Sequence, residues 1–248
     1  TKHSISNIIP IIMINSALQS PNEVVYDAIQ VEYKDMASWY DTFWQSYTHQ
    51  TLIKPLNQVT ALGAADVTVV DVACGTGEFL RRLLVQDVQE NGDDSVADDK
   101  NANRSWIGVE PCPEMLQQAQ KKFSPSDAIE LRQGPAEYLP ISDHSADIVV
   151  TTNAFHFFRD KKRALCEMKR VLKDDGTLII TDWCNDYWIV KFYHWLERVR
   201  WNWRFEDRYP GPLKRSELFQ LVNSEGFQDV EVSKYTVRVF GIFFWGMQ

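Results

Sequence analysis

The amino-acid sequence predicts a doubly wound α/β domain, built on a mostly parallel seven-stranded sheet whose last strand is antiparallel. The first observation behind this prediction is that short β-branched segments alternate with helical patterns between residues 67 and 182. Strands that alternate with helices pair in parallel, and the helices cover both faces of the sheet. The second observation is the length of 248 residues, of which 44% are hydrophobic. This is enough for one large core.

A helical region precedes the sheet. Over residues 22–62, apolar side chains recur at spacings of three and four, as Trp39, Tyr40 and Phe43 illustrate, and this period is typical of an amphipathic helix. Gly63 interrupts the pattern. We therefore expect residues 1–62 to form a helical cap and the sheet domain to begin at residue 63.

The sheet domain opens with a strand, a glycine turn and a helix. Residues 67–72 form a β-branched run, residues 73–77 are small, and residues 79–84 carry apolar side chains at helical spacing. The elements expected after this unit are strand 106–110, helix 114–123, strand 128–132, strand 147–152, helix 161–172, turn 173–176 and strand 177–182. We expect residues 63–182 to form the cofactor-binding core.

Three further segments interrupt or follow this core. Residues 86–105 are rich in acidic side chains and predict a solvated loop insertion. Residues 183–212 are rich in aromatic side chains, and we expect them to cover the substrate. Residues 213–248 predict a helix over 215–225 and strands over 229–233 and 236–244, which would be antiparallel because only two residues separate them.

Composition and charge narrow the function classes. The chain has 34 acidic and 26 basic residues, a formal net charge of -8, which disfavours sequence-independent binding to nucleic acid. The four cysteines lie far apart without a C-x-x-C pair, so we expect neither a metal site nor a disulfide framework. The apolar runs are much shorter than the ~20 residues of a membrane span. We expect a cytoplasmic monomer or homodimer, with removal of an organelle-targeting segment as the alternative.

The turn after the first strand favours a cationic ligand. Gly75 and Gly77 allow the backbone to approach a cofactor closely, but Leu80 stands where a dinucleotide-binding turn has its third glycine. Asp71 and Glu78 flank the turn, and their charge suits a cation better than a pyrophosphate. S-adenosylmethionine fits this requirement, because it carries a sulfonium and an ammonium group and no phosphate.

Four segments, in order, resemble the class I S-adenosylmethionine-dependent methyltransferases, particularly the small-molecule enzymes similar to those of ubiquinone and menaquinone biosynthesis. The segments are VVDVACGTG at 69–77, IGVEP at 107–111, QGPAEYLP at 133–140 and EMKRVLKDDGTL at 167–178. Together they extend over roughly residues 30–182. The resemblance implies a Rossmann-like methyltransferase fold and S-adenosylmethionine as the cofactor.

The same resemblance implies roles for individual residues. Glu110 corresponds to the acid that binds both ribose hydroxyls, and residues 133–140 correspond to the adenine segment. The expected cofactor-binding residues are Tyr40, Asp71, Ala73, Gly75, Gly77, Glu110, Pro111, Pro135, Ala136, Glu137 and Asn153. Two positions depart from the family pattern. Ala73 replaces a glycine, which is tolerable if its backbone is not left-handed. Pro135 replaces an acid, so we expect apolar packing and the Ala136 backbone to hold the adenine.

The acceptor side offers two candidate catalytic residues. His156 follows the fourth strand and Asp182 ends the fifth, so both project from the edge of the sheet where a general base would act. A packed histidine and a helix-capping aspartate are the alternatives.

Candidate substrate-binding residues follow Asp182. Arg200, Arg204 and Arg208 recur every four residues beside tryptophans and would form one cationic face on a helix, which suits an anionic acceptor. The alternative is that these long side chains only cover an amphipathic helix. The substrate-binding candidates are Trp183, Trp188, Arg200, Trp201 and Arg204.

The sequence thus predicts methyl transfer from S-adenosylmethionine to a small-molecule acceptor, with an anionic acceptor as a further expectation and no metal. Two alternatives stay open. One is a nucleic-acid methyltransferase, which the arginine face at residues 200–208 keeps in consideration. The other is a non-catalytic, methyltransferase-like binding subunit.

Overall fold

The computed structural model describes residues 33–63, 67–91, 105–125, 127–188, 191–192, 195, 211–239 and 242–248. Its strands are β1 (Thr68–Val72), β2 (Ser105–Glu110), β3 (Ile129–Gln133), β4 (Ala146–Thr152), β5 (Leu172–Trp183), β6 (Lys234–Val239) and β7 (Ile242–Met247). Its helices are α2 (Tyr40–Thr51), α3 (Ile53–Ala61), α4 (Glu78–Asn91), α6 (Pro113–Gln120), the short η1 (Phe155–Phe157), α7 (Lys161–Val171) and α9 (Arg215–Ser224).

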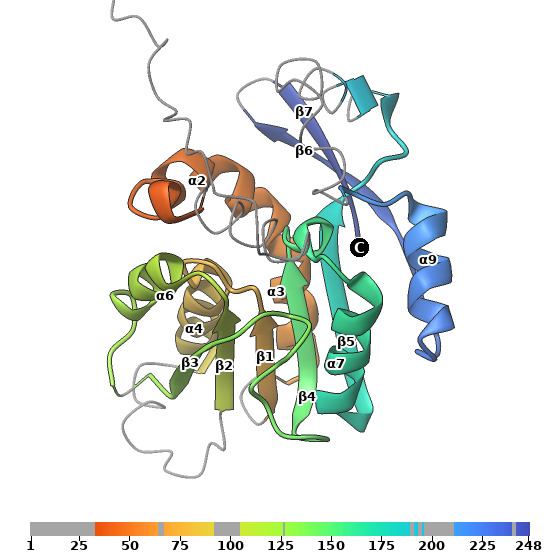
Figure 1. Ribbon diagram of the computed structural model, residues 1–248. Helices are drawn as coiled ribbons and strands as arrows, with labels where there is room; N and C mark the ends of the chain where they lie inside the picture. Colours follow the sequence, from red (N-terminus) through yellow and green to blue (C-terminus); the bar gives the residue numbers. More distant parts are fainter. Residues whose placement is uncertain are drawn as a thin grey trace, which may run out of the picture.

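The strands lie in the order β3-β2-β1-β4-β5-β7-β6 (Figure 1). The first five pair in parallel, which confirms the predicted mostly parallel sheet. β7 is antiparallel to both of its neighbours, and its pairing with β5 extends over two residue pairs, Asp182 with Met247 and Trp183 with Gly246. The chain changes direction across the sheet between β1 and β4, where α/β folds bind ligands.

Two core clusters cover opposite faces of the sheet, because successive strand residues alternate between faces. Val69 belongs to the cluster formed with α3 and α4, whereas Val70 belongs to the cluster formed with α7 and α9. Figure 1 shows these helix pairs on either side of the strands. The sheet is therefore doubly wound, as predicted.

The cap and the fifth strand differ in detail from the expectation. The predicted helix is interrupted at Leu52, between α2 and α3, and this places Pro55 in the first turn of α3, where a missing N–H costs little. The predicted turn at 173–176 lies inside β5 as an irregularity, where pairing jumps from Ala146 with Leu172 to Ile148 with Thr177. The loop insertion predicted over 86–105 is wrong at both ends, because α4 continues to Asn91 and β2 begins at Ser105.

The predicted strand over 229–233 is wrong. Those residues are irregular, and Asp229 has a φ of 52°, which a strand cannot accommodate. Strand β6 begins at Lys234, one of the two residues expected to form the turn. The single strand predicted over 236–244 is also wrong, because that range contains the end of β6 and the start of β7, which pair with each other. The alternation of Val230 and Val232 reflects packing of an extended loop against the core rather than strand pairing.

Within the described residues, no helix is both long enough and apolar enough to cross a membrane.

Candidate cofactor and acceptor site

A cavity of about 110 Å³ lies where β1, β2, β3 and β4 end. The predicted residues that line it are Tyr40, Ala73, Gly75, Glu110, Pro111, Pro135, Ala136, Glu137 and Asn153. Asp71 and Gly77 do not line it. Three of the four resembling segments therefore meet at this cavity, although they are distant in sequence, whereas the fourth, residues 167–178, contributes no residue to its lining.

The turn after β1 is held in left-handed backbone conformations. Ala73, Gly75 and Gly77 have φ values of 59°, 56° and 75°. The condition under which Ala73 was expected to be tolerable is therefore not met, and its side chain costs roughly 1–2 kcal/mol of strain. A hydrogen bond from the Cys74 amide to the Val109 carbonyl, 3.1 Å long, holds this turn against β2.

Gly75 and Gly77 serve different purposes. A Cβ on Gly77 would lie 2.9 Å from the Phe123 ring and 3.1 Å from the Ala119 Cβ, so this glycine permits close packing between the turn and the α6 region. A Cβ on Gly75 would meet only the Met115 methyl group, at 3.5 Å, and Gly75 borders the cavity. Of these two glycines, Gly75 is the one whose missing side chain leaves room for a ligand in the cavity.

Glu110 ends β2 and reaches back toward the glycine turn. One carboxylate oxygen accepts a hydrogen bond from the Gly75 amide at 2.9 Å, and the other accepts one from the Cys112 amide at 3.0 Å. Burial raises the pKa of Glu110 to about 7, although both amide hydrogen bonds oppose the increase. A carboxylate with several lone pairs in a cavity wall suits a ligand that presents hydroxyl groups.

Asp71 lies behind the turn, 1% exposed. Among the residues that the structure describes, neither of its buried carboxylate oxygens has a hydrogen-bond partner. Burial, and then the charge of Glu110, raise its pKa well above the ordinary value. An unpartnered acid in a low-dielectric interior favours a ligand with positive charge nearby.

The cavity wall formed by residues after β3 is mostly apolar. Its one acidic residue, Glu137, already accepts hydrogen bonds from the protein. Ala136 is buried, and the Glu137 carboxylate accepts hydrogen bonds from the amides of Arg159 and Asp160 at 3.0 and 3.3 Å. Glu137 thereby fixes the loop that follows η1. Phe157 and Phe158 from this region complete the wall.

The cap closes the cavity from the other side. Tyr33 and Tyr40 line it, and Asp41 at the start of α2 forms an ion pair with Lys122 at 2.6 Å. The Thr76 hydroxyl donates a hydrogen bond of 2.5 Å to Asp41. Through Asp41, the cap is connected to the glycine turn.

The structure brings the two candidate catalytic residues together. The His156 Nδ1 lies 2.5 Å from the Asp182 Oδ1, and both side chains are buried. Asp182 also accepts a hydrogen bond from the Trp183 amide at 2.8 Å. Neither residue lines the 110 Å³ cavity, but the His156 ring centre lies 4.0 Å from that of Phe157, which does.

Asn153 connects the cavity to an aromatic cluster. Its side-chain oxygen accepts a hydrogen bond from the Tyr47 hydroxyl at 3.0 Å, and its amide donates one to Thr51, also at 3.0 Å. Its φ of 56° is well tolerated by asparagine. The aromatic cluster consists of Trp44, Tyr47, Trp183, Tyr235 and Val237.

Only part of the predicted substrate-binding set can be located. Trp183 belongs to the aromatic cluster, whereas Trp188 is 74% exposed and does not pack against it. Arg200, Trp201, Arg204 and Arg208 lie outside the described residues.

Several lining residues were not predicted. They are Tyr33, Cys112, Met115, Thr152, Ala154, Phe157, Phe158 and Arg159. Phe157 and Phe158 directly follow the candidate His156 in the sequence, and their proximity to it was the available signal. Cys112 and Met115 follow Glu110 closely, and this proximity was the available signal.

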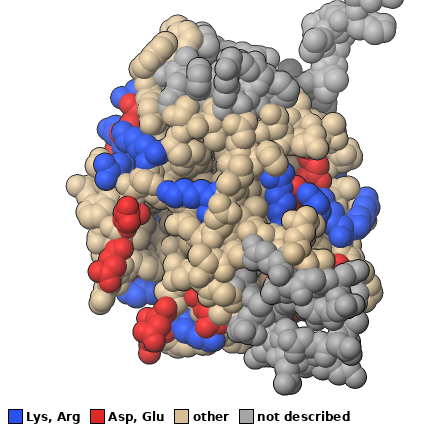
Figure 2. All heavy atoms as spheres, turned by 180° about the vertical axis from the view of Figure 1, so that it is seen from behind, with Lys and Arg blue, Asp and Glu red and all other residues tan. Residues whose placement is uncertain are grey.

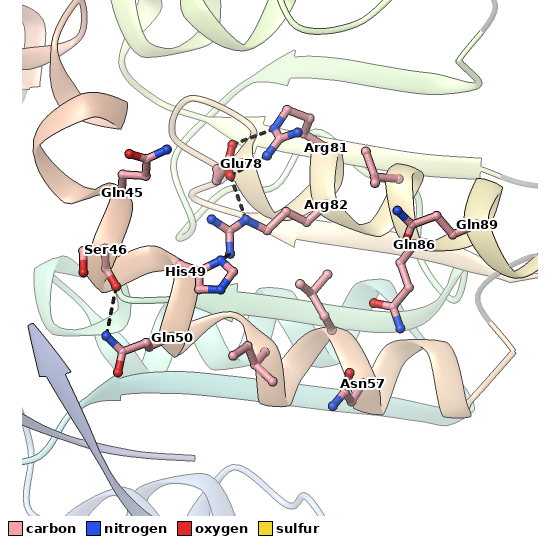
Figure 3. A pocket seen from close by; sticks show the side chains of 13 residues that line it. Gln45, Ser46, His49, Gln50, Asn57, Glu78, Arg81, Arg82, Gln86 and Gln89 are labelled. Atoms are coloured by element: carbon pink, nitrogen blue, oxygen red, sulfur yellow. Dashed lines mark hydrogen bonds and ion pairs between the residues drawn. The ribbon is translucent and has the colours of Figure 1, made fainter.

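A second, wider cavity of about 820 Å³ lies between α2, α3 and α4 (Figure 3). It contains none of the predicted site residues, and much of its wall consists of glutamine side chains. Arg81 and Arg82 point toward Glu78 and form ion pairs with it at 2.9 and 2.7 Å. Its charged groups are thus largely engaged with one another.

Charged side chains of both signs are distributed over the face seen from behind (Figure 2). Many described cations are paired, as Arg132 is with Glu130 and Arg170 with Glu167, each at 2.7 Å. This distribution offers little support for a phosphate-binding surface among the described residues.

Comparison with known proteins agrees with this geometry. Residues 70–180 match the methyltransferase domain family. The chain is 30% identical over 64% of its length to an uncharacterized methyltransferase-like protein of Schizosaccharomyces pombe, and 27% identical over 71% to the demethylmenaquinone methyltransferase of Lactiplantibacillus plantarum. The matches cover 64% and 65% of those proteins, so the chain spans somewhat less than two thirds of these curated relatives.

Solved structures show the same fold. A crystal structure of an S-adenosylmethionine-dependent methyltransferase from Thermotoga maritima superposes with a TM-score of 0.60 at 20% identity, covering 87% of this chain and 96% of that one. The matched family, the relatives and the shared fold all agree with the motifs at the strand ends. Residues 70–180 match a methyltransferase domain, and the relatives and the shared fold support a class I S-adenosylmethionine-dependent methyltransferase.

Proposed function

We propose that this protein transfers the methyl group of S-adenosylmethionine to a small-molecule acceptor at the cavity beside Gly75. The observation that carries the proposal is the Glu110 carboxylate, which lines this cavity while bonded to the Gly75 amide. This geometry places an acid that could bind ribose hydroxyls beside a glycine turn, and the turn itself carries no lysine or arginine that could bind a phosphate. We also propose that the sheet described above corresponds to the seven-stranded sheet of this family, in which the last strand is antiparallel.

The residues present fit this cofactor. Glu110 would accept hydrogen bonds from the ribose hydroxyls, and Asp71, buried without a described partner, would balance the positive charge of the amino acid part. Ala136 and Phe157 would pack against the adenine. When bound, S-adenosylmethionine would supply a methyl group on a sulfonium. The sulfonium needs no further activation, because it leaves as a neutral thioether.

The protein's own task is then to position the acceptor, exclude water and remove a proton. Because Asp182 holds the Nδ1 of His156, the proton of the neutral ring resides on that nitrogen and Nε2 becomes the basic one. The acceptor would lose its proton to Nε2 as the new bond to the methyl group forms. Asp182 orients the ring and stabilises its charged form.

A small molecule is favoured over a nucleic acid. The net charge of -8 and the pairing of described cations disfavour a polyanion. The relative from Lactiplantibacillus plantarum is named for a small-molecule acceptor, demethylmenaquinone. An anionic acceptor stays a prediction, because the arginines on which it depends lie outside the described residues.

The test is a search for methyl transfer. Purified protein is incubated with S-adenosylmethionine and panels of hydroxyl, thiol, amine and carboxylate compounds, and products are detected by mass spectrometry as a gain of one methylene. We expect at least one panel to give a product that the Gly75→Arg variant does not give. S-adenosylhomocysteine binding without product from any panel would instead support a non-catalytic binding subunit.

A further inference from the structure

The aromatic cluster defined above contains two tyrosines whose hydroxyl groups differ. The Tyr47 hydroxyl donates a hydrogen bond to Asn153 at 3.0 Å, and the Trp183 side chain also bonds to it. The Tyr235 hydroxyl is also buried, yet it has no hydrogen-bond partner among the described residues. Leaving a buried hydroxyl unpaired costs about 1–3 kcal/mol, so this group requires an explanation.

The fold places Tyr235 within the electrostatic influence of Asp182, the partner of the candidate base. Trp183 on β5 pairs with Gly246 on β7, and Gly246 pairs with Tyr235 on β6, so the three residues form one row across the sheet. Burial raises the pKa of Tyr235 above its ordinary value, and the charge of Asp182 raises it further. Tyr235 is therefore a neutral donor within electrostatic range of the His156 and Asp182 pair.

The surroundings favour an uncharged aromatic ligand. The His156 ring lies 5.9 Å from that of Trp183, and the Tyr47 ring lies 6.1 Å from it. Of the described cations, Lys161 is influenced by the Asp182 charge, but its ammonium group donates to the carbonyls of His156 and Phe158 at 3.3 and 3.1 Å. Aromatic walls beside a buried carboxylate suit a neutral ring better than an anion.

We propose that Tyr235 determines acceptor specificity, by donating a hydrogen bond to a second oxygen of an aromatic alcohol whose reacting hydroxyl faces His156. This inference rests on the proposed function, and it names an uncharged acceptor in place of the anionic one that residues 200–208 predict. In the reaction, an oxygen–methyl bond forms, the sulfur–methyl bond breaks, and the hydroxyl proton passes to His156. The second oxygen would satisfy the Tyr235 hydroxyl, which has no hydrogen-bond partner among the described residues.

Two probes that differ in one hydroxyl test this proposal. Catechol and phenol are titrated by NMR into the protein loaded with S-adenosylhomocysteine, for wild type, Tyr235→Phe and Tyr187→Phe. Tyr187 packs against the larger core cluster and serves as the matched control. We expect wild type and Tyr187→Phe to bind catechol about ten-fold more tightly than phenol. We expect Tyr235→Phe to bind the two probes equally.

Thermal stability supplies an independent measurement. Tyr235→Phe removes a hydroxyl that has no partner in the described part of the chain, so its Tm should equal or exceed that of wild type. Tyr47→Phe loses its bond to Asn153 and should melt earlier. A Tyr235→Phe protein that still prefers catechol, or that melts well below wild type, would overturn the proposal. So would a wild type that binds neither probe or binds both equally. Failure to bind S-adenosylhomocysteine would instead contradict the proposed function.

Discussion

The cofactor side and the acceptor side of this site are built in different ways. On the cofactor side, functional groups directly follow β1, β2 and β3, and backbone amides fix the key acid, as Gly75 and Cys112 fix Glu110. On the acceptor side, side chains arrive from α2, η1, β5 and β6 and contact one another. The cofactor side can therefore be recognised from short sequence motifs. The acceptor side cannot, because its residues come together only when the chain folds.

The two sides share one property. Each contains a buried polar group without a described hydrogen-bond partner, Asp71 on the cofactor side and Tyr235 on the acceptor side. Each group would be stabilised by a ligand of matching chemistry, a cation for the acid and an oxygen acceptor for the hydroxyl. If the two sides are separable, variants of one should leave the other unaffected.

The largest effect is expected from Gly75→Arg. The new side chain would extend into the cavity from a residue with a φ of 56°, and binding of S-adenosylhomocysteine should fall below detection by calorimetry. Gly63→Arg is the matched control, since Gly63 also has a positive φ but no atom within 4 Å of its added Cβ. Equal binding by both variants would show that the ligand lies elsewhere.

His156→Ala should lower the rate of methyl transfer without changing cofactor binding. Loss of a general base typically lowers kcat by about 10²- to 10⁴-fold, and the loss should be greatest at low pH, where the acceptor ionises least on its own. The dissociation constant for S-adenosylhomocysteine should stay within about two-fold of wild type, because His156 does not line the cavity. A pH-independent change in KM without a change in kcat would indicate that His156 only packs.

Glu110→Ala should weaken cofactor binding by about 1.5–3 kcal/mol, the usual contribution of hydrogen bonds to a charged group. Calorimetry with S-adenosylhomocysteine measures this directly. The variant should leave the acceptor preference, measured at saturating cofactor, unchanged. An unaltered dissociation constant would mean that the ribose is held by other residues.

The same residue predicts a dependence on pH. Because burial raises the pKa of Glu110 to about 7, its charged form is destabilised in the folded protein, and its contribution to stability is lost as the pH rises through about 7. Ribose hydroxyls favour the charged form, so cofactor affinity should fall as the pH drops below 7. Glu110→Gln should remove this dependence, and a wild type with constant affinity from pH 6 to 8 would contradict the assignment.

Asp41→Ala should give the smallest effect. The ion pair with Lys122 fastens the cap, but the Asp41 side chain is 42% exposed, and such pairs contribute roughly 0.2–1 kcal/mol. We expect S-adenosylhomocysteine to dissociate about 1.5- to 5-fold faster in stopped-flow measurements. Lys54→Ala is the control: it removes an exposed hydrogen bond from the cap helix α3 to Ser233, which precedes β6, and should leave the rate unchanged.

The sequence predicted most of the fold, because the strand and helix periods are strong and regular between residues 67 and 182. It failed at residues 229–233, where Val230 and Val232 alternate like a strand but pack as a loop. The left-handed backbone of Ala73 was not predicted, because an alanine in the sequence gives no signal for a positive φ. These errors arise where tertiary packing overrides local preference.

The site was predicted unevenly for the same reason. Glu110 was predicted because the end of a strand fixes both its position and its direction. Neither the bond between His156 and Asp182 nor the presence of Tyr235 near them could be predicted, since each depends on the pairing of distant strands. Spacing along the chain carries no information about such contacts.

The central claim is that the cavity beside Gly75 and Glu110 binds S-adenosylmethionine. The most direct measurement is a calorimetric titration of the wild-type protein with S-adenosylhomocysteine and, separately, with NAD at pH 8. We predict saturable binding of one S-adenosylhomocysteine per chain and no heat from NAD, because the turn carries acids and lacks a third glycine. Saturable binding of NAD without a response to S-adenosylhomocysteine would contradict the account.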